Sequence, residues 1–165
     1  MAVSLKHNNF NTIYTKGNLR REYPETPITA VSGVVFDDRE RVLLIRRASL
    51  PAKGKWSLPG GVVHLGEELD EALKREVQEE SGLSVNPGPL IAVSSRIIHD
   101  TEGEVEYHYI LLDYLCECIH GQLESGSDAS DARWFDLRTI ENLDLTDGVL
   151  EVIRKGRKIH LEMLG

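Results

Sequence analysis

A short segment that places acidic side chains on the apolar face of a helix constrains this chain more than any other feature. Residues 67–81 contain no glycine or proline and predict an α-helix that Gly82 ends. At about 100° per residue, the apolar side chains gather on one face, which must pack against the rest of the fold. These side chains are Leu69, Ala72, Leu73 and Val77. Glu76 and Glu80 fall in the middle of the same arc, and Glu79 lies at its edge.

The inward glutamates need a partner that compensates for their burial. A glutamate-rich helix is normally a solvated surface, but this helix already has a separate polar face. That face consists of Asp70, Glu71, Lys74 and Gln78. Carboxylates turned inward repel one another and lose hydration, which costs several kcal/mol each when nothing compensates. Arg75 can neutralise one of them, and a divalent cation is the simplest partner for the rest. An all-oxygen donor set favours Mg²⁺ or Mn²⁺ over zinc.

A glycine-containing loop precedes the helix. Its sequence is Leu58-Pro59-Gly60-Gly61. Glycine permits the close backbone approach and the unusual φ that a backbone-carbonyl ligand requires. Next to an inward carboxylate cluster, the two glycines are therefore expected to shape the same hard-metal site.

The rest of the chain alternates short apolar runs with polar turns. Residues 1–27 predict an N-terminal arm, and residues 28–165 a single domain. Apolar runs at 28–36 and 41–46 flank four polar residues and predict a hairpin. Further strands are expected at 89–98, 106–119 and 131–136, and a helical tail at 146–162. Strands outnumber helices, so the predicted class is α+β, with a mixed sheet covered by helices.

Composition restricts the partners and the compartment. Among the 165 residues, 19 basic and 27 acidic side chains give a net charge of −8. This field repels a nucleic acid backbone, so we expect no nucleic-acid partner, and a small phosphorylated substrate would have to arrive with cations. No apolar run approaches the ~18 residues of a membrane span, and the first residues lack a secretory apolar region. We therefore expect no membrane partner and a cytoplasmic location. Cys116 and Cys118 are expected to be buried, reduced thiols on one strand face.

One stretch of the sequence carries a family pattern. Gly61, five residues, Glu67 and seven residues lead into Arg75-Glu76-Val77-Gln78-Glu79-Glu80-Ser81-Gly82-Leu83. This arrangement resembles the Nudix box, GX5EX7REUXEEXGU with U aliphatic, and every fixed position is filled. The resemblance covers residues 28 to about 157. It implies the Nudix fold, an α/β/α sandwich with a mixed central β-sheet, and hydrolysis by water of a nucleoside diphosphate linked to another moiety.

The resemblance also assigns a metal site by position. Glu76, Glu79 and Glu80 would bind Mg²⁺ or Mn²⁺, with the carbonyl oxygen of Gly60 completing the set. Arg75 would hold a glutamate in place through a charge-assisted hydrogen bond. Glu79, Glu80 and Arg75 would then form the catalytic centre.

Substrate-side roles are assigned around the same helix. Glu67 would support the loop that precedes the helix, and both Glu67 and Gly61 would contribute to substrate binding. A further carboxylate is expected from the loop before a late strand, where Asp128 matches the family's position and would also contact substrate. Either Asp128 or Glu79 would take the proton of the attacking water. The rival acids are Glu102, Glu104 and Glu106, at a charged turn.

Three stretches bear on the substrate. Residues 23–28, 107–116 and 127–134 are similar to the bacterial and archaeal ADP-ribose pyrophosphatase-like branch, which implies cleavage of ADP-ribose to AMP and ribose 5-phosphate. Two markers differ: His99 stands where many ADP-ribose enzymes have a proline, and the tyrosine of diadenosine polyphosphate hydrolases is missing. Residues 51–56 also resemble nucleotide-sugar hydrolases. Nucleotide sugars and (oxidised) nucleoside triphosphates therefore stay open as substrates.

A function of another class is also open. A non-catalytic, nucleotide-sensing Nudix module need not retain the carboxylates, whereas this chain has all of them. An RNA-directed hydrolase is disfavoured by the acidic charge and by the absence of a basic stripe. The sequence does not define the oligomeric state, and a homodimer that exchanges the N-terminal arm between subunits stays open.

Overall fold

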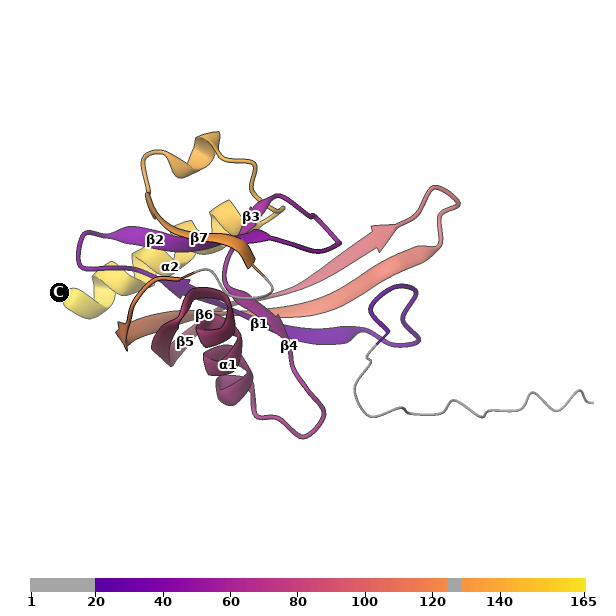
Figure 1. Cartoon of the computed structure of the whole chain (residues 1–165), viewed down its shortest axis with the longest axis horizontal. Coiled ribbons are helices and arrows are strands. Elements are labelled where there is room, and N and C mark those ends of the chain that lie inside the picture. Colours follow the sequence, from indigo (N-terminus) through magenta and orange to yellow (C-terminus); the bar gives the residue numbers. More distant parts are fainter. Residues whose placement is uncertain (1–19, 125–128) are drawn as a thin grey trace, which may run out of the picture.

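The computed structural model describes residues 20–124 and 129–165 and contains two sheets and two α-helices (Figure 1). The strands are β1 (Ile28–Val35), β2 (Arg41–Arg47), β3 (Trp56–Ser57), β4 (Gly60–Val62), β5 (Leu83–His99), β6 (Val105–Gly121) and β7 (Ala129–Asp136). The helices are α1 (Leu69–Ser81) and α2 (Val149–Leu164), with a short 3-10 helix at Ile140–Asn142. A mixed sheet has the order β4-β1-β6-β5, and a second sheet has the order β3-β2-β7.

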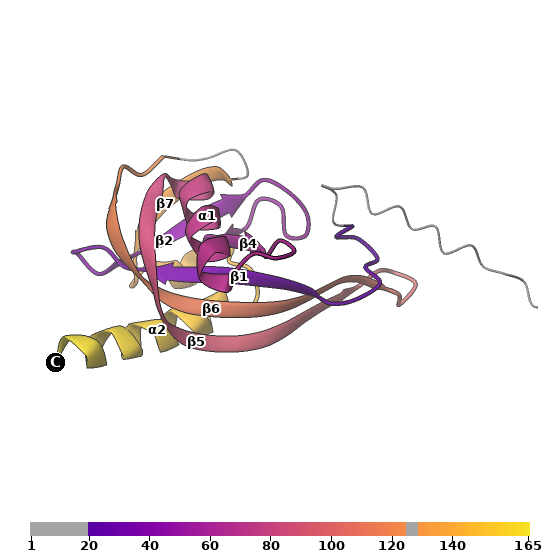
Figure 2. The same cartoon turned by 90° about the horizontal axis from the view of Figure 1, so that it is seen from below.

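One helix packs on each face of the mixed sheet, as Figure 2 shows. Side chains alternate along β1, because successive residues of a strand point to opposite faces. Val31 and Val35 therefore share a buried cluster with Leu73 of α1, whereas Val34 shares another with Ile153 of α2. This arrangement confirms the predicted α+β class and the mixed sheet between helices.

The predicted hairpin of residues 28–36 and 41–46 is wrong, because the two strands separate into different sheets. They are joined by a single bridge, between Phe36 and Val42. The reason is burial, since the four residues from Val42 to Ile45 are each at most 1% exposed. A strand that is buried on both faces needs a layer on each side. β2 consequently becomes the centre of its own sheet rather than the partner of β1.

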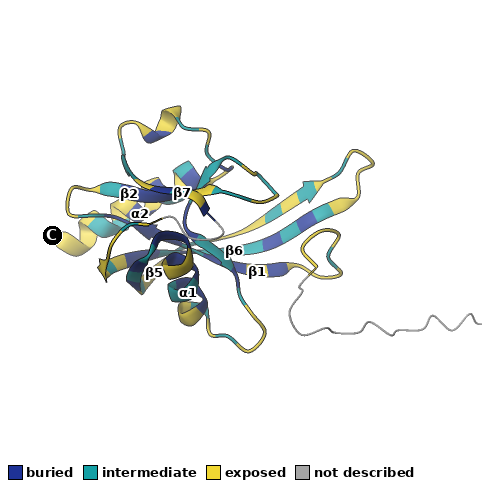
Figure 3. Cartoon of the chain, viewed as in Figure 1, coloured by how far each residue is buried: buried dark blue, intermediate teal, exposed yellow. Residues whose placement is uncertain are grey.

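The strand after α1 begins earlier than the sequence predicts, at Leu83 rather than at residue 89. Pro87 and Pro89 interrupt the sequence pattern of a strand, but β5 lies at the edge of its sheet, where proline is tolerated. Register shifts between Pro87 and Leu90 accommodate both prolines. β5 and β6 continue beyond the body as a long hairpin, and Figure 3 shows that exposed residues gather at its end.

The end of the N-terminal arm is attached to this hairpin. The backbone N–H of Tyr23 donates to the carbonyl oxygen of Glu106 at 2.8 Å. The hydroxyl of Tyr107 donates to the carboxylate of Glu22, also at 2.8 Å. Glu22 and Tyr23 are therefore held against the β5–β6 hairpin.

Two smaller expectations can be compared with the fold. Cys116 is buried as predicted, whereas Cys118 is half-buried; both are free thiols in the cluster beneath α1. Among the described residues, no helix is both long and apolar enough to cross a membrane.

Candidate active site

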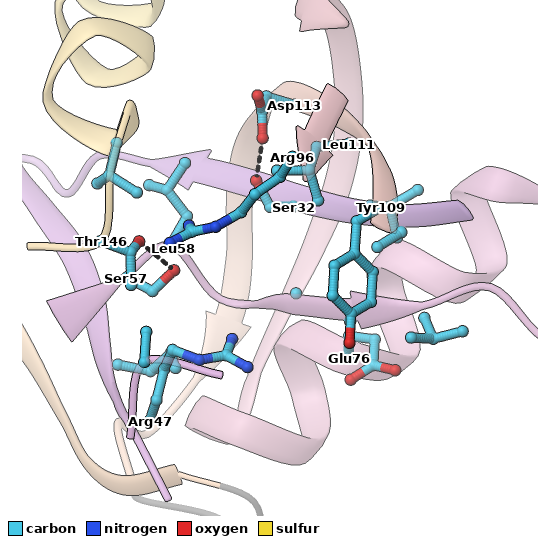
Figure 4. A pocket seen from close by; sticks show the side chains of 18 of the residues that line it. Ser32, Arg47, Ser57, Leu58, Glu76, Arg96, Tyr109, Leu111, Asp113 and Thr146 are labelled. Carbon is cyan, nitrogen blue, oxygen red and sulfur yellow. Dashed lines mark hydrogen bonds between the residues drawn. The ribbon is translucent and has the colours of Figure 1, made fainter. Parts of the chain in front are cut away.

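A cavity of about 470 Å³ opens between the two sheets, beside α1 and the N-terminal end of α2 (Figure 4). Its wall on the side of α1 is acidic, and β2, β5 and β6 supply the opposite wall and the floor. The cavity therefore joins the predicted carboxylate cluster to elements that are far from it in the sequence.

The α1 glutamates lie as the helical pattern predicts. Glu76 and Glu80 are 8% and 5% exposed, while Glu79 is exposed, and all three line the cavity. Burial raises the pKa of Glu76, against the opposing effect of its hydrogen bond with Arg75. Two of the three carboxyl groups are thus held inside the fold.

The two glycines let the backbone approach these carboxylates closely. The N–H of Gly60 donates to Glu80 Oε2 at 2.8 Å. A Cβ on Gly60 would lie 2.2 Å from the carbonyl oxygen of Val31, and a Cβ on Gly61 would lie 2.4 Å from the carboxyl carbon of Glu76. No larger residue fits at either position without movement of the strand or of Glu76.

Arg75 connects the loop and the helix. Its Nε donates to Glu67 Oε1 at 2.7 Å, and its Nη2 donates to the carbonyl oxygen of Val62 at 3.1 Å. Its Nη1 donates to Glu76 Oε1 at 2.7 Å and lies 3.4 Å from Glu79 Oε2. The hydrogen bonds with Arg75 lower the pKa of Glu67 to about 2. One arginine therefore compensates three glutamates, where the sequence predicted one.

Three arginines extend the site away from the acidic wall, and the sequence analysis missed them. Arg47 ends β2, Arg96 lies on β5, Arg21 precedes β1, and all of them line the cavity near Tyr109. Desolvation lowers the pKa of Arg47, partly opposed by the charge of Glu80, and the positive charges of Arg96 and Arg21 lower it further. Such a cluster of cations provides a place for anionic groups of a ligand.

A buried acid on the floor was also missed. Asp113 of β6 is 5% exposed, and Ser32 Oγ donates to its Oδ1 at 2.5 Å. In the sequence this residue stands inside an apolar run, Ile110-Leu111-Leu112-Asp113-Tyr114-Leu115, where an isolated acid is the one available indication of a site.

Among the described residues, none of the further carboxylates predicted from the sequence lines this cavity. Asp128 lies outside the described residues. Glu102, Glu104 and Glu106 occupy the end of the β5–β6 hairpin and do not belong to the described lining of the cavity. Asp100 Oδ1 accepts hydrogen bonds from the backbone of Glu102 and Glu104, each at 2.9 Å, so these rival acids belong to a charged turn.

The chemistry of the α1 acids fits a hard divalent cation. The donors are carboxylate oxygens, and the structure holds two of them buried beside the Gly60–Gly61 backbone. Within residues 20–124 and 129–165, no three His, Cys, Asp or Glu side chains converge closely enough to hold a metal, and Arg75 contacts both Glu76 and Glu79. The donor set therefore fits Mg²⁺ or Mn²⁺ in kind.

Comparison with known proteins agrees with this site. A model of the NUDIX domain matches residues 26–155. The chain belongs to the Nudix family. It is 38% identical over 117 residues to a protein of Methanocaldococcus jannaschii named ADP-ribose pyrophosphatase, a match that covers 71% of this chain and 66% of the relative. It is 31% identical over 132 residues to the 8-oxo-dGDP phosphatase NUDT18 of Danio rerio, covering 78% of this chain and 38% of the relative.

Solved Nudix structures share the fold. A MutT protein of Methanosarcina mazei has a TM-score of 0.68 at 25% identity and covers 82% of this chain and 97% of its own. The NUDIX domain of Shewanella oneidensis NrtR, in complex with ADP ribose, has a TM-score of 0.67 at 21% identity and covers 82% and 90%. The likeness to NrtR concerns the fold alone. The family and the named hydrolase relatives support a pyrophosphohydrolase activity, and the chain spans less than two thirds of the length of these two relatives.

The buried acid of the cavity floor predicts a pH dependence of stability. Burial raises the pKa of Asp113, more than the hydrogen bond from Ser32 lowers it. Above the ordinary pKa of about 4, the folded chain therefore retains a proton that the unfolded chain has lost, and the free energy of unfolding falls as pH rises through the raised pKa. Asp113→Asn removes this contribution. We expect the stability of the variant relative to the wild type to increase as pH rises above the ordinary carboxyl pKa of about 4, measured by urea unfolding. A stability difference that is independent of pH would contradict the assignment.

Proposed function

We propose that this Nudix pyrophosphohydrolase cleaves ADP-ribose to AMP and ribose 5-phosphate, using Mg²⁺ or Mn²⁺. The observation that carries the proposal is the pairing of two walls in one cavity. Buried Glu76 and Glu80 form one wall, and the Arg47 and Arg96 side chains extend the other. A pyrophosphate that bridges two groups fits between a metal on the first wall and cations on the second.

Glu76, Glu79, Glu80 and the carbonyl oxygen of Gly60 would hold the metal. When bound, the ion neutralises phosphate charge and acidifies the attacking water. Arg75 orients Glu76 and keeps Glu67 ionised, and Glu67 in turn accepts the N–H of His64 at 2.9 Å, which fixes the loop before α1. Gly61 leaves the space that the Glu76 carboxyl group occupies.

The reaction itself breaks one P–O–P bond. Water attacks one phosphorus, the bridging oxygen leaves with the other, and each product keeps one phosphate. Glu79, exposed at the cavity, is available to accept the proton of the water, and Asp128 stays the predicted alternative. Arg47, Arg96 and Arg21 bind the phosphate oxygens and limit the charge that the metal alone must offset.

A second substrate class has one specific observation in its favour. The match to the protein named 8-oxo-dGDP phosphatase spans 78% of this chain, slightly more than the match to the named ADP-ribose pyrophosphatase. An oxidised purine nucleoside diphosphate is therefore the second candidate. The cytoplasmic location, the homodimer and the lack of a nucleic-acid partner stay predictions from the sequence.

A substrate panel tests the proposal. ADP-ribose, 8-oxo-dGDP, a UDP-sugar and a nucleoside triphosphate are incubated at equal concentration with Mg²⁺ or Mn²⁺, and products are identified by chromatography. We expect the highest kcat/KM with ADP-ribose, products AMP and ribose 5-phosphate, and loss of activity in chelator that either metal restores. Faster hydrolysis of 8-oxo-dGDP or of the triphosphate would overturn the substrate, and full activity in chelator would overturn the metal mechanism.

Two isosteric substitutions on opposite faces of α1 test the carboxylate wall. Glu80→Gln removes a buried charge and one metal ligand, so we expect kcat to fall by about two orders of magnitude or more with thermal stability kept or slightly raised. Glu71→Gln is the matched control, because Glu71 is exposed and pairs with Lys74 at 2.9 Å. Its kcat should equal that of the wild type. Similar losses in the two variants would show that the acidic wall has been assigned to the wrong face.

A further inference from the structure

The floor of the cavity contains a polar group that the cleavage of pyrophosphate does not use. Tyr109, Leu111 and Asp113 alternate along β6, so they share one face of the mixed sheet, and all three line the cavity (Figure 4). Among the described residues, the Asp113 carboxyl group has one hydrogen-bonding partner, Ser32. A carboxyl group has about four acceptor positions, so most of its capacity is left for a ligand.

The strand register gives the position of Asp113 relative to the metal wall. Gly60 of β4 pairs with Ser32 of β1, and Ser32 pairs with Asp113 of β6. Two strand spacings of about 4.8 Å separate Gly60 from Asp113, which gives about 10 Å across the sheet. This is the separation of the two backbones, so Asp113 stands two strands away from the loop that borders the predicted metal site.

The surroundings of Asp113 suit a planar, largely apolar group. Leu58 and Val149 are buried, Leu111 and Val152 are half-buried, and all four line the cavity. The same cavity is also lined by polar side chains, among them Ser57 and Thr146, and apolar surface with a few fixed polar groups is the usual form of a ligand-orienting site. A buried carboxyl with a single partner contributes little to stability by itself, which leaves recognition of a ligand as its use.

We propose that Asp113, held in place by Ser32, accepts a hydrogen bond from the exocyclic amine of the substrate's adenine base and so selects adenine over hypoxanthine. The inference rests on the proposed function, which supplies an adenine nucleotide. Hypoxanthine has a carbonyl oxygen where adenine has the amine, so it offers Asp113 an acceptor in place of a donor. Unmatched polar groups at a buried site are costly.

The hydrogen bond from Ser32 makes the selection directional. Because Ser32 donates to Oδ1, that oxygen stays an acceptor, and a proton on the carboxyl group would reside on Oδ2. The selection belongs to the ionised form, which only accepts hydrogen bonds, because a neutral carboxyl group could donate to the carbonyl oxygen of hypoxanthine.

Binding of the mononucleotides AMP and IMP tests the inference without turnover. Calorimetry on the full-length protein measures both dissociation constants in the wild type, in Asp113→Ala and in a matched control, Glu117→Ala. Glu117 is an exposed acid on the same strand, outside the described cavity lining. We expect AMP to bind about tenfold more tightly than IMP in the wild type and in the control, and the ratio to fall close to one in Asp113→Ala.

Three results would overturn the inference: equal binding of AMP and IMP by the wild type, an unchanged ratio in Asp113→Ala, or a preference for GMP that is lost in that variant. If Asp113→Ala does not fold, Asp113→Leu fills the same space with apolar atoms and makes the same comparison. The proposed function and this inference can be disproved independently of each other. When ADP-ribose is cleaved but the ratio does not depend on Asp113, only the inference is wrong. When ADP-ribose is not cleaved but the ratio does depend on Asp113, only the proposed substrate is wrong.

Discussion

The contacts of Arg75 hold the rest of the site in its arrangement. This side chain reaches Glu67 before the helix, Glu76 on the helix, and the carbonyl oxygen of Val62 at the end of β4. Without it, α1 would carry buried carboxylates with no fixed cation, at a cost of several kcal/mol. With it, the loop, the strand and the helix form one unit that brings acidic groups to the cavity. The position of α1 on the sheet thus serves both folding and the metal site.

The sequence predicted this unit well because all of its information is local. The 3.6-residue period places Glu76 and Glu80 on the packed face of α1, and both are buried. The pairing of strands cannot be predicted from such a local pattern, because it depends on burial on both faces and on neighbours distant in sequence. The run from Val42 to Ile45 looked like the second strand of a hairpin, yet its complete burial places it at the centre of another sheet.

The other half of the cavity could not be predicted for the same reason. Arg47, Arg96 and Asp113 come from three strands, and only the register of those strands and the packing of the two sheets bring them to one cavity. The two arginines are unremarkable in sequence, since Arg47 ends an apolar strand and Arg96 stands among exposed residues of β5, whereas Asp113 stands out only as an acid within an apolar run. The substrate-specific part of the protein is thus built from long-range contacts, whereas the shared chemistry of the family resides in one continuous segment.

The central claim is that the fold places buried glutamates beside a glycine backbone so that a divalent cation can bind. Titration of the protein with Mn²⁺ without nucleotide, followed by electron paramagnetic resonance, tests it most directly. Gly61→Ala places a Cβ 2.4 Å from the carboxyl carbon of Glu76 and introduces no strained φ. The account predicts that the wild type binds Mn²⁺ and that Gly61→Ala binds it at least about tenfold more weakly with unchanged secondary structure. Equal affinity in the two proteins would contradict the account.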